Sequence, residues 1–347
     1  MKWGDLISLE YGKPVQDKDR ADGKYPVFGT NGQIGTTNLP PLCNHPSMIL
    51  GRKGAYRGVH YSDGPCSVID TAFYTELRSD KVDMKWVYYK FLTYDINQMD
   101  TGSAIPSTDR YEIYSIDVEV PPIRVQKQVV QELEILDQKI RVNKRINDNL
   151  QQQVTQLFKS WFIDQTSSNY LSKWQQTTLG TITTITNGKR PLIKKAKKTI
   201  SESIPIIGAS SIMGYTSKSL YNEKIIVTGR VGTHGIIQRM HSACWPSDNT
   251  LVIKSQFYEF VYQILHTINY KNLNRGSTQP LITQSDLKNF EIILPPIEVL
   301  QTFENVAGSL MGMYDLYSNQ NENLSQLRDT LLPQLMSGYI ELDNIYI

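Results

Sequence analysis

The chain has 347 residues, of which 40% are hydrophobic and 20% are charged, with a formal net charge of +2. This length predicts two domains, and the composition predicts enough apolar material for two cores. The small net charge neither requires nor excludes a polyanionic partner, because a basic surface can be hidden within a neutral total. The absence of long apolar runs predicts no membrane span and no signal peptide, and three scattered cysteines are typical of reduced thiols. We therefore expect a cytoplasmic protein without disulfides.

The predicted elements occur twice along the chain. The first copy runs from a tryptophan segment ending in YGKP, through strand-like runs and a Gly-Arg-x-Gly turn, to a short helix at 84–96 and a Gly-Ser segment before Pro121 and Pro122. The same landmarks recur in the same order up to Pro295 and Pro296, a shift of 174 residues. In the second copy they read NGKRP, IPIIGASSIMG, IIVTGRVGTHG, YEFVYQILHTI and RGSTQPLI. This order predicts a duplicated mixed α/β domain, at residues 1–120 and 168–294.

After each proline pair the hydrophobic period becomes helical, over residues 121–164 and 295–338. Proline is tolerated in the first helical turn, so the first helix is predicted to begin near Ile123. Its predicted seam is Val129, Leu133, Leu136, Ile140, Asn143, Asn147, Leu150, Val154, Leu157 and Trp161. The second seam is Phe303, Ala307, Leu310, Tyr314, Tyr317, Asn321, Leu324, Arg328, Leu331 and Leu335. The spacing is typical of a coiled coil and favours antiparallel pairing about a pseudo-two-fold axis, with the seam asparagines penalising slipped registers.

Motifs for covalent chemistry are absent or weak. The sequence has no Walker loop, and its five histidines show no spacing typical of a metal site. Asp70, Asp83 and Lys85 loosely resemble the carboxylate and lysine set of a nuclease, but the second copy has no counterpart. We therefore predict no catalytic residue, no metal ligand and no cofactor in this chain.

Basic residues gather at glycine turns in both copies, which predicts nucleic-acid binding. Glycine lets the backbone approach a phosphate, and Arg and Lys supply positive charge and donors to base edges. The turn residues are Lys13, Arg52, Lys53, Arg57, Lys189, Arg190 and Arg230. The predicted DNA-binding set also includes Lys194 and Lys195 of the run KKAKK, and Arg275 and Ser277 of the second Gly-Ser segment.

Three segments in combination resemble the specificity subunits of Type I DNA restriction-modification enzymes. They are GSTQPLITQSDLKNFEIILPPIEVL from Gly276, LFKSWF from Leu157 and LRDTLLPQLMSGYIEL from Leu327. The resemblance extends over essentially the whole chain. In one departure, the Glu-Gln pair that the family often has beyond the prolines is Val125-Gln126 in the first copy and Val299-Leu300 in the second.

The resemblance implies a non-catalytic subunit with two target-recognition domains. Such a subunit binds a bipartite double-stranded DNA target, one half-site per domain, and its helix pair determines the unspecified gap. It recruits two modification subunits and, through them, restriction subunits, so that S-adenosylmethionine, ATP and Mg²⁺ belong to these partners. The alternatives are a subunit of a methylation-only or Type IIB-like system, a nuclease using Asp70, Asp83 and Lys85, and a coiled-coil scaffold without DNA affinity.

Overall fold

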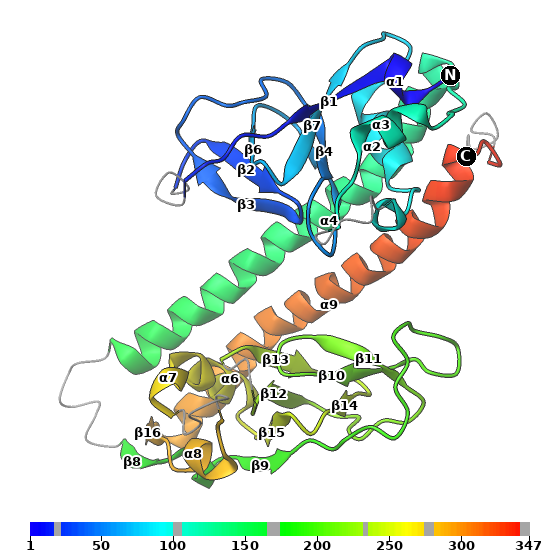
Figure 1. Ribbon diagram of the computed structural model, residues 1–347. Coiled ribbons are helices and arrows are strands. Elements are labelled where there is room, and N and C mark those ends of the chain that lie inside the picture. Colours follow the sequence, from blue (N-terminus) through cyan, green and yellow to red (C-terminus); the bar gives the residue numbers. More distant parts are fainter. Residues whose placement is uncertain (17–21, 100–105, 165–173, 232–234, 274–280, 341–347) are drawn as a thin grey trace. The chain divides into compact units, whose positions relative to one another are not determined.

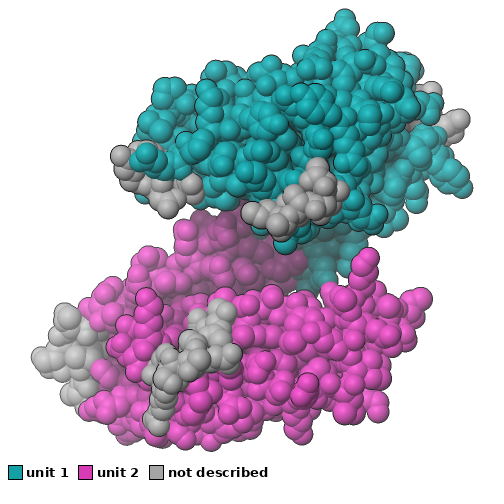
Figure 2. All heavy atoms as spheres, viewed as in Figure 1, with its two compact units in different colours: residues 1–143, 319–347 teal, residues 144–318 magenta. Residues whose placement is uncertain are grey.

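The structure is a computed structural model that describes residues 1–16, 22–99, 106–164, 174–231, 235–273 and 281–340 (Figure 1). The chain forms two compact units, which are coloured separately in Figure 2. Unit 1 comprises Met1–Asn143 and Asn319–Ile347, and unit 2 comprises Lys144–Ser318. Each unit combines one α/β domain with part of each long helix, whereas the sequence predicted domains and helices as four separate segments. No helix in the described ranges is both long and apolar enough to span a membrane.

The domain of unit 1 contains two small sheets. The first has the spatial order β1 (Ile7–Tyr11), β7 (Ala72–Leu77), β4 (Ser47–Gly51) and β5 (Val59–Ser62), with antiparallel neighbours. The second has the order β3 (Gly32–Thr37), β2 (Tyr25–Gly29) and β6 (Ser67–Val68), in which β2 and β6 run parallel. Strand β4 reads SMILG and is buried along its whole length, as a continuous apolar run predicts for a central strand.

Short helices complete this domain. They are α1 (Trp3–Leu6), α2 (Met84–Phe91), the 3-10 turn η2 (Ile96–Gln98) and α3 (Arg110–Ser115). The short helix predicted at 84–96 is present as α2, which starts at Met84 as expected but ends at Phe91. It begins at Met84 because the carboxylate of Asp83 accepts hydrogen bonds from the backbone N–H groups of Lys85 and Trp86, which are unpaired in the first helical turn.

The domain of unit 2 repeats this topology. Its first sheet has the order β13 (Ile237–Met240), β12 (Ile225–Gly229), β15 (Thr250–Lys254) and β9 (Thr184–Asn187), and its second has the order β11 (Ile212–Thr216), β10 (Ile204–Ile207) and β14 (Trp245–Pro246). The remaining elements are β8 (Gln175–Thr178), η4 (Leu179–Thr181), α6 (Tyr258–Thr267), α7 (Tyr270–Leu273), α8 (Gln284–Lys288) and β16 (Glu291–Leu294), which pairs with β8. Because β9, β15, β12 and β13 correspond in order to β1, β7, β4 and β5, the predicted duplication is confirmed.

Two long helices supply part of both cores. Helix α4 (Ile123–Phe158) continues into a π-helical turn at Lys159–Ile163, and α9 spans Ile297–Met336. The predicted helix start near Ile123 is therefore confirmed. The core of unit 1 includes Val129 and Leu133 of α4 with Leu332 and Leu335 of α9. The core of unit 2 includes Val154 and Phe158 of α4 with Phe303, Ala307 and Met311 of α9. Each domain is thus packed onto its helices by apolar burial, the main stabilising effect in folding.

Candidate nucleic-acid interface and helix pair

Turns that are distant in sequence meet at one end of the first sheet of unit 1. Lys13 follows β1, and its N–H donates to the carbonyl of Val68 at 2.8 Å. Arg52 and Lys53 follow β4, and both donate N–H groups to the carbonyl of Thr71, at 2.8 and 3.1 Å. The fold therefore brings three predicted binding residues to one region, in which Lys13 and Lys53 are exposed.

The ring of the exposed Tyr11 contacts two arginines of this region. The guanidinium of Arg52 lies 4.7 Å from the ring centre of Tyr11, and that of Arg110 lies 4.8 Å from the same ring. Arg52 also donates from Nη1 to the carbonyl of Asp70 at 2.9 Å. Cation–π contacts of this kind contribute roughly 0.5–1 kcal/mol at exposed sites. They hold two arginines in position, and sequence reasoning missed Arg110 because it lies far from the glycine turns.

The equivalent turns of unit 2 have the same backbone geometry. Lys189, which follows β9, donates its N–H to the carbonyl of Pro246 at 2.9 Å, and Arg230, which follows β12, donates to Asn249 at 2.8 Å. Lys189 and Arg190 are exposed, and Arg230 is half-buried. Lys13 and Arg52 of unit 1 therefore correspond to Lys189 and Arg230 of unit 2.

Two glycines make these turns possible. A Cβ atom on Gly12 would lie 2.1 Å from the carbonyl oxygen of Ile69, and one on Gly188 would lie 2.1 Å from that of Ser247. No side chain fits at such distances, so each turn requires glycine before its lysine. The glycine–lysine pairs that were singled out in the sequence are therefore structurally matched positions.

The other predicted binding residues have different surroundings. Lys194 and Lys195 are exposed between β9 and β10, where the backbone of Lys195 pairs with Tyr215 of β11. Arg57 is only 2% exposed, and its Nη2 donates to the carbonyls of Ile96 and Asn97 at 3.3 and 2.9 Å. Arg57 therefore differs from the exposed turn residues, because its buried guanidinium holds η2. Arg275 and Ser277 lie outside the described residues.

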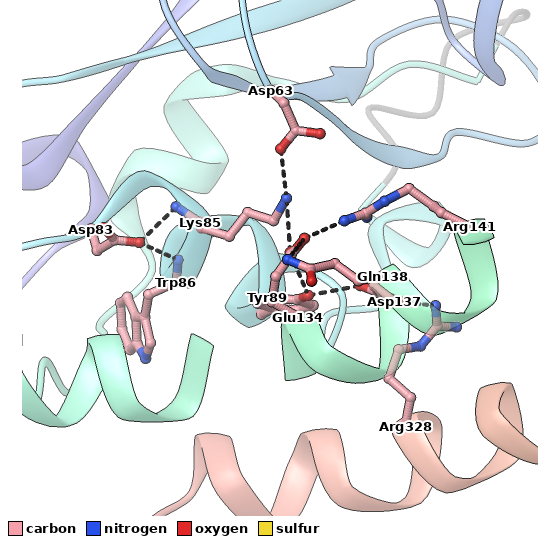
Figure 3. Close-up of polar contacts among 10 residues, drawn as sticks. All are labelled: Asp63, Asp83, Lys85, Trp86, Tyr89, Glu134, Asp137, Gln138, Arg141 and Arg328. Carbon is pink, nitrogen blue, oxygen red and sulfur yellow. Dashed lines mark hydrogen bonds and ion pairs between the residues drawn. The ribbon is translucent and has the colours of Figure 1, made fainter. Parts of the chain in front are cut away.

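The residues of the nuclease alternative are not gathered into one site. Asp83 caps α2 through its carboxylate. The ammonium group of Lys85 lies between Asp63 and Glu134, at 3.0 and 3.1 Å, as Figure 3 shows. Asp70 instead lies in the turn beside Arg52. Among the described residues, no group of three or more His, Cys, Asp or Glu side chains could hold a metal ion.

Polar contacts join the domain of unit 1 to both of its helices. The carboxylate of Asp137 on α4 accepts hydrogen bonds from the hydroxyl of Tyr89 on α2, at 2.7 Å, and from Nη1 of Arg328 on α9, at 2.9 Å (Figure 3). Glu134 is paired with Arg141 as well as Lys85. Burial alone would raise the pKa of Glu134, but these two cations outweigh it and lower the pKa below its usual value. Glu134 is therefore a stable anion near neutral pH.

The buried line along α4 follows most of the predicted seam but also includes Gln126, whereas the predicted seam residue Trp161 is half-buried. Its members are Gln126, Val129, Leu133, Asp137, Ile140, Asn143, Asn147, Leu150, Val154 and Phe158. Asp137 and Phe158 take the places predicted for Leu136 and Leu157, which are half-buried. On α9 the predicted seam residues Leu310, Asn321, Leu324 and Leu331 are also half-buried.

The seam asparagines contact α9 within each unit. In unit 1, Nδ2 of Asn143 donates to Oδ1 of Asn321 at 2.9 Å. In unit 2, Nδ2 of Asn147 donates to Oγ of Ser318 at 2.9 Å. In unit 1 the pairs are Asp137 with Arg328 and Asn143 with Asn321, and in unit 2 they are Asn147 with Ser318 and Phe158 with Phe303. In each unit the residue numbers rise along α4 and fall along α9, so the helices pair antiparallel. The partner of Asn321 is thus Asn143, and Asn147 bonds to a serine.

Unit 2 joins its domain to α9 with a different set of charges. Arg239 on β13 pairs with Glu259 on α6 and lies 3.6 Å from Asp315 on α9. The carboxylate of Glu304 on α9 accepts N–H groups of Glu259 and Phe260 in the first turn of α6, at 3.0 and 2.7 Å. Burial raises the pKa of Glu304 to about 7, against the effect of these donors.

Two positions that the repeat makes equivalent carry opposite charges. Lys85 corresponds to Glu259 on the short helices, and Arg141 corresponds to Asp315 on the long helices, each by the shift of 174 residues. The charged contacts between domain and long helix therefore differ between the units. In unit 1 Lys85 and Arg141 pair with Glu134 on α4, whereas in unit 2 Glu259 and Asp315 lie beside Arg239.

Two copies of one α/β domain, each with a basic turn cluster and each packed on paired long helices, define a duplicated recognition subunit. Comparison with known sequences gives the family. The chain belongs to the family described as "Type I restriction modification DNA specificity domain", whose model matches residues 1–152 and 171–304. As a Type I specificity subunit it is the non-catalytic member of its restriction-modification system.

Individual relatives agree with this assignment. The Type I restriction enzyme MjaIX specificity subunit of Methanocaldococcus jannaschii is 24% identical, over 77% of this chain and 71% of the relative. The HindI specificity subunit of Haemophilus influenzae is 23% identical, over 66% and 70%. The crystal structure of a Type-I restriction-modification system S subunit from M. genitalium has a TM-score of 0.63 at 15% identity and covers 96% of this chain and 95% of that chain. This last similarity concerns the fold alone.

Proposed function

We propose that the chain binds a bipartite double-stranded DNA target, with one half-site bound by each domain. The observation that carries this proposal is the matched pair of basic turns, Lys13 with Arg52 in unit 1 and Lys189 with Arg230 in unit 2. Equivalent cations on equivalent backbones favour equivalent ligands, and the phosphates of a duplex supply the same ligand at both half-sites. The paired helices α4 and α9 then determine the length of the unspecified gap.

Neutralising one matched lysine should weaken DNA binding and reduce its salt dependence. Log affinity falls as log salt rises. We expect Lys13→Gln and Lys189→Gln each to make this slope less steep by about one unit, because one phosphate contact is lost. Fluorescence anisotropy across a salt series measures both quantities. The matched control is Lys139→Gln, an exposed lysine on α4. Unchanged slopes for both test variants would place the DNA surface elsewhere.

We further propose that two modification subunits bind the long helices, and that restriction subunits join the complex through them. Exposed apolar side chains occur at positions related by the repeat. Ile123 and Ile297 are 41% and 55% exposed, and Val142 and Leu316 are 47% and 65% exposed. Two equivalent apolar sites favour two copies of one partner, since exposed apolar residues on helices are candidates for burial in an interface.

Introducing an aspartate at one of these sites should prevent one modification subunit from binding. We expect Val142→Asp and Leu316→Asp each to give complexes with a single modification subunit, and the double variant to give none, because a buried carboxylate without a partner is strongly disfavoured. Native mass spectrometry of the complex reports the stoichiometry. Gln131→Asp, on an exposed polar position of α4, is the control. Retention of two modification subunits by the double variant would contradict the proposed surface.

A further inference from the structure

The segment between β9 and β10 of unit 2 presents apolar side chains to solvent among lysines. Leu192 is 95% exposed and Ile200 is fully exposed, which makes them the most exposed large apolar residues in the part of the chain that the structure describes. The intervening and neighbouring lysines are Lys194, Lys195, Lys197 and Lys198, all of them exposed. Single exposed aliphatic residues are common on protein surfaces, but two that are almost fully exposed on one short segment indicate a candidate contact surface.

Hydrogen bonds fix the turn that carries Ile200. The N–H of Thr199 donates to the carbonyl of Glu202 at 3.0 Å, and the N–H of Glu202 donates to Oγ1 of Thr199 at 2.9 Å. The carboxylate of Glu202 accepts from the hydroxyls of Thr199 and Ser201, at 2.5 and 2.7 Å. These contacts close the turn on both sides of Ile200. The isoleucine is therefore held outward by a folded turn.

A second attachment ties the segment to the β-sheet behind it. Lys195 and Tyr215 exchange two backbone hydrogen bonds, at 2.9 and 2.8 Å, which adds the segment to the edge of β11. Strand β11 itself exposes Ile212 and Met213, at 51% and 39%. The apolar side chains thus come from two connected elements, seen beside each other near β10 in Figure 1. Exposed lysines and exposed aliphatic residues therefore occur on this segment and on the strand that it pairs with.

The fold does not require these apolar residues, because the sequence of unit 1 has no counterpart to them. The corresponding stretch between β1 and β2 reads KPVQDKDRADGK, which contains one large aliphatic residue, Val15, and mixes acidic with basic residues. Unit 1 nevertheless has the same strand order. Leu192 and Ile200 are therefore a feature of the second domain alone.

We propose that this segment is a wedge that inserts Ile200, assisted by Leu192, into a base step of duplex DNA at the half-site of the second domain. This inference rests on the proposed function. Proteins that kink DNA insert apolar side chains between base steps, and the cost of unstacking is offset because the bent duplex contacts more of the protein surface. Lysines beside such a side chain can neutralise the adjacent phosphates. The segment contains both parts, and it directly follows the Gly188–Lys189 turn of the basic cluster. The half-site of unit 1 is bound without such a distortion.

The test places 2-aminopurine at successive positions of a target selected from a random library, bound by the full chain with its modification subunits. Fluorescence should rise at one step of the second half-site, because unstacking removes quenching. Ile200→Ala should abolish the fluorescence rise and weaken DNA binding several-fold. Leu192→Ala should make the fluorescence rise smaller without abolishing it. Ile293→Ala, an isoleucine of the same unit that is 56% exposed on β16, should leave the signal unchanged.

Each contrary result has a separate meaning. Specific DNA binding without an unstacked step overturns the wedge and leaves the proposed function intact. Absence of specific binding by the unmodified complex overturns both. Binding of the chain to anionic phospholipid vesicles that is lost in Ile200→Ala, with DNA binding unaffected, would assign the segment to a membrane surface and contradict the wedge. Thermal unfolding of Ile200→Ala should match that of the parent chain, because the side chain is exposed and contributes nothing to a core.

Discussion

A chain lengthened by one heptad in each long helix should select DNA targets whose unspecified gap is about three base pairs longer. The insertions belong between Asn143 and Lys144 on α4 and between Ser318 and Asn319 on α9, where the two compact units divide both helices. Seven residues extend a helix by about 10 Å and preserve the coiled-coil spacing, and duplex DNA rises about 3.4 Å per pair. Site selection from a library with random spacers measures the new gap.

The half-sites themselves should stay unchanged, because neither domain is altered. Affinity should fall, since the added pairs also rotate one half-site about the duplex axis and the DNA must twist or bend to compensate. A chain with four residues inserted at both places serves as the control, because it breaks the heptad period. Recovery of the original gap with undiminished affinity would show that the helices do not determine the spacing.

Replacing residues 1–120 with residues 175–294 of the same chain should convert the target to two copies of the second half-site. The repeat places these stretches at equivalent positions, and each domain is proposed to bind its half-site independently. Affinity for the original target should drop by about five- to 150-fold for each altered base pair, since a mismatch typically costs about 1–3 kcal/mol. The same library selection reports the preferred sequence. Continued preference for the original bipartite target would contradict the assignment of one half-site to each domain.

In this chimera two arginines should meet at the contact between the transplanted domain and α4. Arg239 of the transplanted domain would lie next to Arg141, where its own unit provides Asp315. We expect Arg141→Asp to raise the thermal stability of the chimera by restoring the attraction. The substitution breaks the ion pair of Arg141 with Glu134 in both chains, but only in the chimera does the new carboxylate gain Arg239 as a partner, so the substitution should destabilise the parent chain. The opposite signs of the two effects distinguish a specific contact from a general effect of the substitution.

Periodic features of the sequence predicted most of the architecture. Proline pairs, a helical period and an ordered set of landmarks were enough to predict two copies of one domain and two long helices, because each feature reflects local backbone preference. At Leu136 the predicted seam is displaced by one residue, and the reason is a set of contacts between distant segments. Asp137 is buried in its place because Tyr89 and Arg328 satisfy its carboxylate, and neither partner can be inferred from the spacing of apolar residues.

The candidate site was less predictable because exposure depends on contacts between distant segments. Arg57 lies beside a glycine, as most of the other basic turn residues do, yet the fold buries it against η2. Arg110 has no glycine nearby but stacks on Tyr11 with Arg52. Lys13 and Lys189 were predicted as members of a set, whereas their equivalence became visible only from the matched backbone bonds to Val68 and Pro246.

Polar pairing in the seam also limits how target spacing can change in evolution. Asp137 depends on Arg328, and Asn143 depends on Asn321. An insertion in one helix alone would separate these partners and leave a buried carboxylate uncompensated, which costs about 3–5 kcal/mol out of a folding stability of about 5–15 kcal/mol. Intermediates with one lengthened helix should therefore be eliminated by misfolding before their new spacing could be selected. Lineages should change their spacing abruptly, through events that lengthen both helices together, and their gap lengths should form a discontinuous series.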